Sequence, residues 1–330
     1  MNVLVAGGAG YIGSHTVKRL KEAGHTPIIY DNASRGHRQV AEILKVRAVF
    51  ADLNDKETLV QTLREHKIEC VMHFAAFAYV GESVEKPLSY YHNNVATTIN
   101  VLEAMKEAGV NTFIFSSTCA IFGDPERIPL TEDQRKSPVS PYGRSKLMVE
   151  QILADEIVAN KNFRFAALRY FNASGCALDG TVGEDHDPET HLIPVTIQVA
   201  MGQRPALKLF GTDYPTPDGT NVRDYIHVED LADAHIRAME KLQAGQSMYL
   251  NLGTGRGFSN REIIKAVEKV TGKKVAVEEG PRRAGDAIAL YADPSRAKEV
   301  LGWEAKHKDP VEIIRSAWNW HSKHPHGYGK

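Results

Sequence analysis

Cysteine is scarce in this chain of 330 residues, which contains only Cys70, Cys119 and Cys176. They form no CxxC pair, and their odd number argues against a scaffold held together by disulfides. We therefore expect reduced, mostly buried thiols. An excess of charge is lacking too, because 40 lysines and arginines face 41 aspartates and glutamates. This balance predicts no bulk attraction to nucleic acids or anionic lipids.

Long apolar runs are also missing. The most apolar stretch, residues 70–80, is interrupted by His73 and is too short to span a bilayer. The first residues, MNVLVAGGAG, place no basic segment before an apolar run, so a signal peptide is not expected. With 42% hydrophobic and 25% charged residues, the composition is that of a globular protein and excludes a disordered chain. We expect a cytoplasmic protein without a nucleic-acid or membrane partner.

The first half of the chain alternates short apolar runs with amphipathic segments. Strands are expected at residues 2–6, 26–30, 46–51, 70–74, 112–116 and 165–169, and helices at 11–23, 56–66, 89–108 and 141–159. Alternating strands and helices predict a parallel sheet with helices on both faces. The expected fold class is α/β, with a Rossmann-type doubly wound parallel sheet.

This alternation ends after about Asn172. Residues 173–190 are rich in glycine, aspartate and glutamate and are expected to form a loop. Later helices are expected at 192–202, 230–242 and 259–270, and strands at 208–210 and 248–252. We divide the chain into a dinucleotide-binding domain, residues 1–172, and a smaller α/β C-terminal substrate lobe, residues 173–330. Segments after Val222 are candidates to return to the main sheet.

A glycine-rich loop joins the first expected strand to the first helix. Gly7, Gly10 and Gly13 are spaced GxxGxxG, which differs from the commonest dinucleotide fingerprint, GxGxxG. Gly7 permits a tight turn, Gly10 lets backbone N–H groups approach a pyrophosphate, and Gly13 allows close packing of helix and strand. Asp31 ends the second strand, where a carboxylate accepts hydrogen bonds from an adenosine ribose. Asp52, after the third strand, is a candidate acceptor for the adenine amino group.

The charge of Asp31 bears on the choice of cofactor. A carboxylate at this position repels a 2′-phosphate, which favours NAD over NADP. Arg35 and Arg38 follow closely in the sequence and weaken that preference. We therefore predict a dinucleotide site that takes NAD.

Tyr142 and Lys146 lie four residues apart at the start of the second long helix, so they point to one face of it. Ser140 suits the N-cap and Pro141 the first helical position. A nearby ammonium group and the helix N-terminus both favour a phenolate, so we expect a lowered pKa for Tyr142 and a general base. The hydroxyls of Ser116-Ser117-Thr118 follow an expected strand, at the sheet edge where α/β proteins bind ligands.

Longer motifs carry a family resemblance. They are VLVAGGAGYIGSH, HFAAFAYVGESVEKP, FSSTCAIFG, SPYGRSKLMVEQI, LRYFNASG, GTDYPTPDGTNVRDYIHVEDLADAH, YLNLGTG, GPRRAGD and HPHGYG. Nearly end to end, the chain resembles the extended short-chain dehydrogenase/reductases, and specifically the UDP-glucose (UDP-galactose) 4-epimerase family. The resemblance implies an isomerase of galactose metabolism that contains tightly bound NAD, regenerated in each turnover, and forms a transient 4-keto sugar.

The resemblance also assigns roles to individual residues. Tyr142 would be the catalytic base, with Thr118 and Lys146 as its partners. The NAD site would comprise Gly7, Gly10, Tyr11, Ile12, Gly13, Asp31, Asn32, Asp52, Leu53, Phe74, Ala75, Asn93, Ser116, Tyr142, Lys146 and Phe171. The UDP-sugar site would comprise Thr118, Asn172, Leu192, Phe210, Arg223, Arg283, Asp286 and Leu290. Arg223 and Arg283 suit a diphosphate, and Asp286 suits a ribose hydroxyl.

Departures from the family pattern leave more than one sugar possible as the substrate's sugar group. Leu290 occupies the position that gates sugar size, where tyrosine excludes N-acetylated sugars and a small residue admits them, so acceptance of UDP-GlcNAc and UDP-GalNAc is an alternative. The FAYVGES and SSTC motifs also resemble UDP-arabinose/UDP-xylose 4-epimerases. Cys119 and Ala120 argue against a 4,6-dehydratase, which needs an acid and a base there. An inactive NAD-binding sensor is the alternative outside the enzymes, and the intact Tyr142 and Lys146 argue against it.

Two further expectations concern assembly and metals. The family usually forms homodimers through its two long helices, and a homodimer is expected here. No metal site is expected, because His321, His324 and His326 lack carboxylates at a suitable spacing and are interpreted as a solvated tail. Trp303, Trp318 and Trp320 are interpreted as packing residues.

Overall fold

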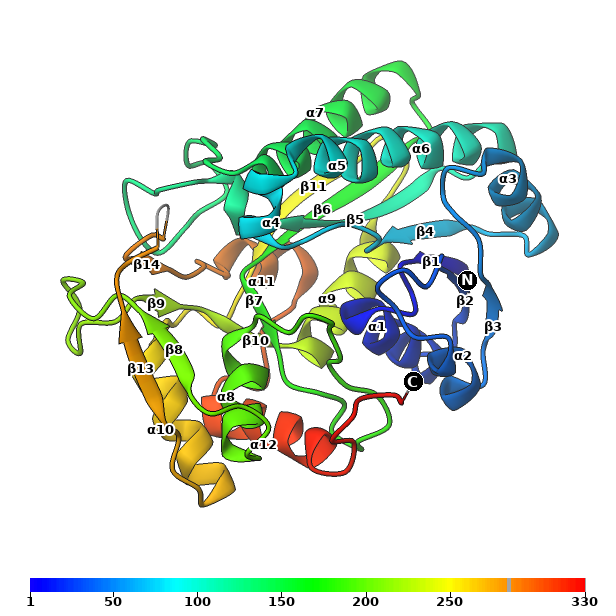
Figure 1. Cartoon of the computed structure of the whole chain (residues 1–330). Helices are drawn as coiled ribbons and strands as arrows, with labels where there is room; N and C mark the ends of the chain where they lie inside the picture. Colours follow the sequence, from blue (N-terminus) through cyan, green and yellow to red (C-terminus); the bar gives the residue numbers. More distant parts are fainter. Residues whose placement is uncertain (284–285, 330) are drawn as a thin grey trace.

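A seven-stranded parallel sheet forms the centre of the computed structural model, which describes residues 1–283 and 286–329 (Figure 1). Its order is β11-β6-β5-β4-β1-β2-β3, so the chain winds outward from β1 in two directions. The strands are β1 (Asn2–Ala6), β2 (Thr26–Tyr30), β3 (Arg47–Val49), β4 (Cys70–His73), β5 (Thr112–Thr118), β6 (Arg164–Tyr170) and β11 (Ser247–Leu252). This confirms the predicted Rossmann-type α/β fold, whose ligand crevice lies where the strand order reverses.

Helices cover both faces of this sheet. One face carries α1 (Tyr11–Glu22), α2 (Gln39–Leu44), α9 (Val228–Lys241) and α11 (Ser295–Leu301), and the other carries α3 (Lys56–Glu65), α6 (Thr97–Ala108) and α7 (Pro141–Ala159). Alternate residues of β1 contribute to two separate apolar cores. Val3 and Val5 pack with α1 and α9, while Leu4 packs with α3 and α6. Strands buried on both faces explain the continuous apolar runs in the sequence.

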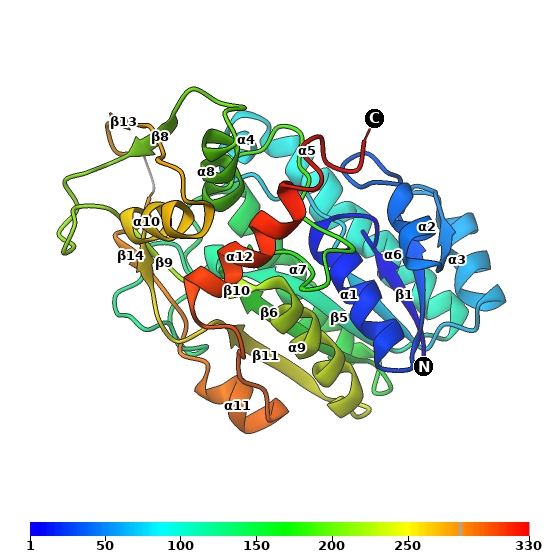
Figure 2. The ribbon, with the colours of Figure 1, turned by 90° about the horizontal axis from the view of Figure 1, so that it is seen from below.

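The remaining elements form a smaller lobe beside the sheet (Figure 2). Its apolar core joins α8 (Leu192–Ala200), α10 (Asn260–Thr271) and α12 (Pro310–His321) to the parallel pair β8 (Leu207–Phe210) and β13 (Val277–Gly280). Short ladders connect the lobe to the sheet: β7 (Asn172–Ser174) with β10 (Tyr225–His227), and β9 (Val222–Arg223) with β12 (Phe258–Ser259) and β14 (Ala289–Leu290). Because β11 pairs with β6, the chain returns to the large sheet after building part of the lobe.

The structure corrects the expectation of a single long helix before β5. The helix expected at 89–108 is three helical segments, α5 (Pro87–Tyr91), a π-turn (His92–Ala96) and α6, preceded by the unpredicted α4 (Val80–Glu85). The side chain of Asn94, in the π-turn, bonds the backbone of Phe77 and the hydroxyl of Ser145, so a tertiary contact holds the extra residue. Residues 173–190 are irregular except for the end of β7.

The expected solvated C-terminal tail is wrong for His321, whereas His324 and His326 are exposed. His321 is buried, His324 stacks on Trp320 with ring centroids 5.0 Å apart, and the Tyr328 hydroxyl bonds the backbone of Gly183. The tail folds back because Trp320 anchors it in the core of the small lobe. Trp303 and Trp320 are both buried packing residues as predicted, Trp303 in a core of the large sheet.

The scarce cysteines behave as predicted: Cys70, Cys119 and Cys176 are all free thiols, and Cys70 and Cys176 are buried. Across residues 1–283 and 286–329, no helix is both long and apolar enough to cross a membrane.

Candidate active site at the carboxyl edge of the sheet

The glycine loop between β1 and α1 is held tightly at both ends. Gly7 has φ +80°, and a Cβ atom there would lie 2.6 Å from the backbone nitrogen of Ala75. A Cβ on Gly13 would collide with the carbonyl oxygen of Gly7, so only glycine lets α1 approach the turn this closely. Gly10 is the N-cap of α1, and neither a capping side chain nor an acidic residue occupies the first turn. The helix therefore presents N–H groups and positive potential suited to a pyrophosphate.

Asp31 lies at the end of β2, beside this loop. Its carboxylate accepts hydrogen bonds from the N–H groups of Ala9 (3.0 Å) and Ala33 (2.8 Å), which fixes its orientation. Burial raises the pKa of Asp31, and the two N–H donors oppose that shift. Arg35 pairs with Glu82 at 3.2 Å, and Arg38 stacks on Phe50 at 4.3 Å. Both arginines expected to weaken the preference for NAD thus have partners of their own.

Other predicted cofactor residues line the same edge. Asn32 donates to the Asp52 carboxylate at 3.0 Å, and a hydrogen bond from the Asn54 backbone lowers the pKa of Asp52. Phe74 and Ala75 continue β4, and both of their N–H groups bond the carbonyl oxygen of Ala6. Further residues of the set are Tyr11 and Ile12 on α1, Leu53 after β3, Asn93 in the π-turn and Phe171 after β6.

The three hydroxyls at the end of β5 have three different partners. Ser116 Oγ bonds the Tyr170 hydroxyl, and Ser117 Oγ donates to Glu150 at 2.6 Å. Thr118 caps the short turn that follows by accepting from the Ala120 N–H at 3.2 Å, and it lies against the Tyr142 phenol. Strand alternation turns Ser117 to the opposite face from Ser116 and Thr118. Of the latter two, Ser116 is engaged by Tyr170, and Thr118 faces the phenol.

Tyr142 and Lys146 share one face of α7, as predicted. The Ser140 side chain caps the helix by accepting from the Gly143 N–H at 3.1 Å, and Pro141 is the first helical residue. Lys146 Nζ donates to the carbonyl oxygen of Ser116 at 2.7 Å, which ties the helix to β5. The spacing of four residues thus places both residues on the face of α7 that meets the edge of the sheet.

The expected lowering of the Tyr142 pKa is wrong for the protein alone. Burial raises the pKa of Tyr142 to about 12, and the Thr118 hydroxyl offsets only part of that shift. Burial also lowers the pKa of Lys146 to about 7, against a smaller opposing effect of Glu150. A dry site disfavours both charged forms, so the ammonium group that was expected to stabilise the phenolate is itself destabilised.

A buried ion pair that was not predicted from the sequence joins α7 to the strands β5 and β6. Arg169 on β6 forms two hydrogen bonds with the Glu150 carboxylate, at 2.9 and 2.6 Å, and both side chains are almost fully buried. Glu150 also accepts from Ser117, so it connects α7, β5 and β6. Its only sequence signal was a glutamate four residues after Lys146 on a helix, a spacing that is common in surface pairs.

The residues predicted to hold the nucleotide diphosphate converge from distant parts of the small lobe. Asp286 lies between Arg283, which donates to it at 3.0 Å, and Arg223, whose Nη2 is 3.8 Å from its carboxylate. Arg223 also donates to the Ala287 carbonyl oxygen at 2.9 Å, and Arg283 stacks on Phe210 at 5.2 Å. The two arginines therefore form one positive site with a single carboxylate within it.

Leu290 connects that positive site with the sheet edge that carries Thr118 and Tyr142. It pairs with Arg223 across the β9–β14 ladder and packs against a small apolar cluster that includes Cys119, Phe122 and Phe171. Asn172, at the start of β7, donates to the Asp224 carbonyl oxygen at 3.1 Å. Leu192, the first residue of α8, instead packs on the core of the small lobe. A ligand anchored by the arginines would thus extend past Leu290 toward Thr118.

Comparisons with known proteins agree with this geometry. The NAD dependent epimerase/dehydratase family matches residues 3–253. A UDP-glucose 4-epimerase of Lacticaseibacillus casei is 48% identical over 330 residues, which are 100% of this chain and 99% of that protein. The structure of UDP-glucose 4-epimerase from Brucella ovis in complex with NAD aligns with a TM-score of 0.92 and 49% identity, covering 96% of this chain and 97% of that one.

A second solved structure carries both expected ligands. UDP-glucose 4-epimerase from Bifidobacterium longum, in complex with NAD+ and UDP, aligns with a TM-score of 0.95 and 40% identity, covering 99% of this chain and 100% of that one. The similarity extends over both lobes, because these alignments span nearly the whole of each chain. This protein therefore belongs to the NAD dependent epimerase/dehydratase family and, within it, to the UDP-glucose 4-epimerase family.

Proposed function

We propose that this protein is an NAD-dependent isomerase that interconverts UDP-glucose and UDP-galactose. The observation that carries the proposal is the position of Leu290, which is paired with Arg223 and packed on the segment that follows Thr118. It connects a positive site for a diphosphate with a phenol and a hydroxyl at the sheet edge. A UDP-sugar held by its diphosphate presents its sugar to those two groups.

The chain's residues suit NAD at the sheet edge. The glycine loop has no room for a side chain at Gly7 or Gly13, and the first turn of α1 carries no negative charge. The Asp31 carboxylate stands ready to accept from a ribose, since backbone N–H groups fix its orientation. When bound, NAD supplies the hydride acceptor of the first half-reaction and the hydride donor of the second.

In the proposed mechanism Tyr142 takes the proton from the 4-hydroxyl of the sugar and later returns it to the 4-keto sugar. Thr118 orients the phenol and hydrogen-bonds the sugar. Lys146, whose pKa of about 7 lets it carry a proton in part of the molecules at neutral pH, provides positive charge on the same helix face when it is protonated. Arg223 and Arg283 hold the diphosphate, so the 4-keto sugar is retained while it turns over between the half-reactions. Asp286 accepts a hydrogen bond from the uridine ribose.

A direct assay tests this proposal. The purified protein is incubated without added NAD with UDP-galactose, UDP-GalNAc and UDP-arabinose in separate reactions, and the products are identified by chromatography. We expect conversion of UDP-galactose to UDP-glucose. Conversion of the pentose alone would replace the hexose assignment by the UDP-arabinose/UDP-xylose alternative. No conversion of any of the three would overturn the enzyme assignment and favour an NAD-binding sensor.

We also propose a cytoplasmic homodimer formed through α5–α6 and α7. Of the apolar residues on these helices, Tyr90, Val101, Val149 and Leu153 are buried in the core of the monomer. Ile99 and Met148 remain 40% and 41% exposed on α6 and α7, which lie on the same side of the sheet (Figure 1). Light scattering of Ile99→Glu combined with Met148→Glu should report monomers where the unaltered chain forms dimers. Dimers in the variant would exclude this interface.

A further inference from the structure

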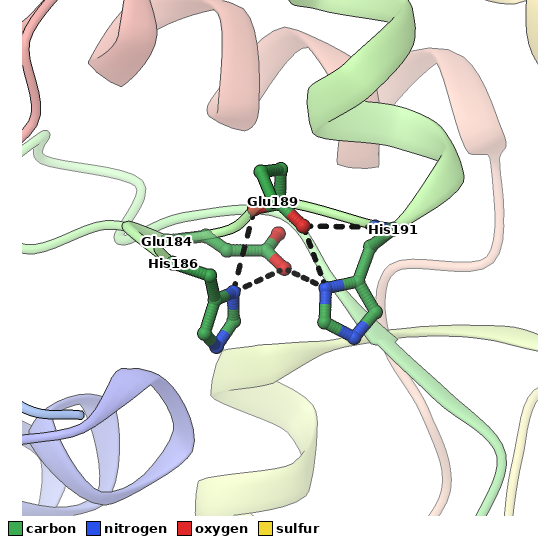
Figure 3. Close-up of side chains that lie close together, drawn as sticks. All are labelled: Glu184, His186, Glu189 and His191. Atoms are coloured by element: carbon green, nitrogen blue, oxygen red, sulfur yellow. Dashed lines mark hydrogen bonds and ion pairs between the residues drawn. The ribbon is translucent and has the colours of Figure 1, made fainter. Parts of the chain in front are cut away.

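Four side chains of the types that ligate metals converge in the loop that leads into α8, where one of them contacts Tyr11 of the predicted NAD set (Figure 3). They are Glu184, His186, Glu189 and His191, and one ligand atom of each lies within 4.8 Å of the other three. The carboxylates of Glu184 and Glu189 are almost fully buried. Two carboxylates brought together out of water need positive charge beside them.

The distances within this cluster suit a tetrahedral ion better than paired hydrogen bonds. His186 Nδ1 lies 3.4 Å from Glu184 Oε1 and 3.4 Å from Glu189 Oε2. His191 Nδ1 lies 3.2 Å from the same Glu184 oxygen and 2.8 Å from the other Glu189 oxygen, Oε1. In a tetrahedral zinc site with bonds of about 2.0–2.1 Å, neighbouring ligand atoms lie roughly 3.3–3.4 Å apart. Three of the four distances are close to that edge length, and two exceed the usual N–H···O range.

The number of imidazole N–H protons available to the two carboxylates also favours a metal ion over hydrogen bonds. Each imidazole directs Nδ1 toward both carboxylates. The His191 proton can serve Glu189 at 2.8 Å, but the His186 proton lies too far from both carboxylate oxygens, at 3.4 Å, to make a good hydrogen bond to either. A single divalent ion bound by the two Nδ1 atoms, Glu184 Oε1 and one oxygen of Glu189 would serve all four side chains. Two neutral imidazoles and two carboxylates with a divalent cation also give a site without net charge.

Outer contacts hold the ligands in place. Glu189 Oε1 accepts from the backbone N–H groups of Thr190 (2.7 Å) and His191 (2.8 Å). An aromatic ring lies beside each imidazole, with Tyr11 at 5.8 Å from His186 and Tyr79 at 6.1 Å from His191 between ring centroids, while the His191 side chain stays 45% exposed. Carboxylates oriented by further hydrogen bonds are typical of metal sites.

We propose that Glu184, His186, Glu189 and His191 bind one Zn²⁺ ion per chain in a closed, structural site. The nitrogen and oxygen donors suit zinc, and four protein ligands leave no open position for a substrate. The ion would fix the loop that precedes α8. That loop also bonds the Tyr79 hydroxyl through the Pro188 carbonyl oxygen at 3.2 Å and packs on Tyr11, so it joins the small lobe to the sheet edge.

The test is zinc binding by the full-length chain, freed of any affinity-tag histidines and stripped of metal with a chelator. Zn²⁺ is then titrated in competition with a chromophoric chelator, and bound metal is counted by mass spectrometry. We expect one ion per chain, and Co²⁺ in its place should show the visible absorption of a tetrahedral site. Absence of both stoichiometric zinc and that band would overturn the proposal.

Variants locate the site. His186→Ala and the conservative Glu189→Gln should each weaken zinc binding by more than about 100-fold, since even outer-shell changes cost 10- to 100-fold. His25→Ala is the matched control, because His25 also pairs with one glutamate, Glu240 at 3.1 Å, but lies outside the cluster. It should bind zinc like the unaltered chain. Unchanged binding in folded Glu189→Gln, verified by circular dichroism, would assign the metal elsewhere and overturn the proposal even if His186→Ala fails to fold.

Discussion

The proposed reacting groups on α7 and the histidine–glutamate cluster before α8 both lie mostly out of solvent, but their pKa values shift in different ways. The shifts favour neutral forms on α7 and charged forms in the cluster. Burial raises the pKa of Tyr142 to about 12 and lowers the pKa of Lys146 to about 7, so both groups favour their neutral forms. In the second cluster burial alone would lower the histidine pKa values, but the two glutamates raise the pKa of His186 to about 9 and of His191 to about 10.

The difference comes from the partners within hydrogen-bonding distance. Glu150, the carboxylate nearest to Lys146 along α7, is occupied by Arg169 and Ser117, so the ammonium group bonds only a neutral carbonyl oxygen. Each histidine of the other cluster faces two carboxylates within 3.4 Å. The groups proposed to exchange a proton therefore lack fixed counter-charges, whereas the cluster proposed to hold a loop has them.

The largest expected effect is the loss of turnover when the phenol of Tyr142, the proposed base, is removed. Tyr142→Phe removes the phenol and should lower kcat by about 1,000-fold, because general acid–base catalysis contributes effects of that order. The ring remains, so absorbance and mass spectrometry should still detect bound NAD. Tyr249→Phe, on β11, removes a phenol outside the site and should keep normal turnover. A Tyr142→Phe enzyme with near-normal kcat would remove this residue from the role of base.

The second effect concerns the two arginines, which differ in exposure. The side chain of Arg223 is 15% exposed and that of Arg283 is 60% exposed, although both contact Asp286. Loss of a charged hydrogen bond costs about 1.5–3 kcal/mol, so Arg223→Ala should raise KM for the UDP-sugar about 10- to 100-fold. Arg283→Ala should have a smaller effect, because solvent screens an exposed charge. Initial-rate kinetics measure both, and equal KM values for all three proteins would remove the arginines from the substrate site.

The third effect tests the charged state of the histidine–glutamate cluster in zinc-free protein. The pKa values of His186 and His191 are raised on folding, so their stabilisation is complete below about pH 6.5, the ordinary histidine value. This stabilisation is lost as the pH rises through about 9 for His186 and about 10 for His191. The Tm should fall over that window by roughly 2–4 °C for each kcal/mol lost.

His186→Gln provides the control for this pH dependence, since the amide does not titrate. Calorimetry of that variant should show a flatter Tm between pH 7 and 10 than the unaltered chain. Parallel curves for the two proteins would mean that the imidazole is already neutral at pH 7, and the contrast with Tyr142 and Lys146 would disappear.

The smallest effect concerns sugar size at Leu290. Its side chain packs beside Phe122 and Phe171, so its volume sets the space beyond Thr118. Leu290→Ala should raise kcat/KM for UDP-GalNAc relative to UDP-galactose, and Leu290→Tyr should lower it, each by about 10-fold, the range for changes of side-chain size in an apolar pocket. Competition assays give the ratio directly. An unchanged ratio in both variants would place the gate elsewhere.

Local sequence signals predicted much of the sheet edge. The glycine loop, the start of α7 at Pro141 and its Ser140 cap all lie where the spacing of residues placed them. Glycine spacing, capping residues and apolar periodicity act over a few residues, so a sequence can be interpreted there without a tertiary structure.

Other expectations depended on contacts between distant segments and were incomplete. Three consecutive hydroxyls were grouped together, although Ser116 and Ser117 have their own partners on β6 and α7. The tail was expected in solvent, although Trp320 buries His321. The Glu184–His191 cluster was passed over as loop, although its four ligand types lie within eight residues of the sequence. Their convergence depends on the loop's path, which no periodic pattern reports.

The sequence by itself determined the α/β alternation, the family and the order of the motifs along the chain, because these rest on local spacing and on identity to relatives. Only the tertiary structure decided which charges meet. It brought Arg223 and Arg283 to one carboxylate and left Lys146 without an acidic partner, and it gave each histidine of the loop two glutamates. The physical reason is that burial and Coulomb interactions act through space, across segments whose separation along the chain carries no information about their distance.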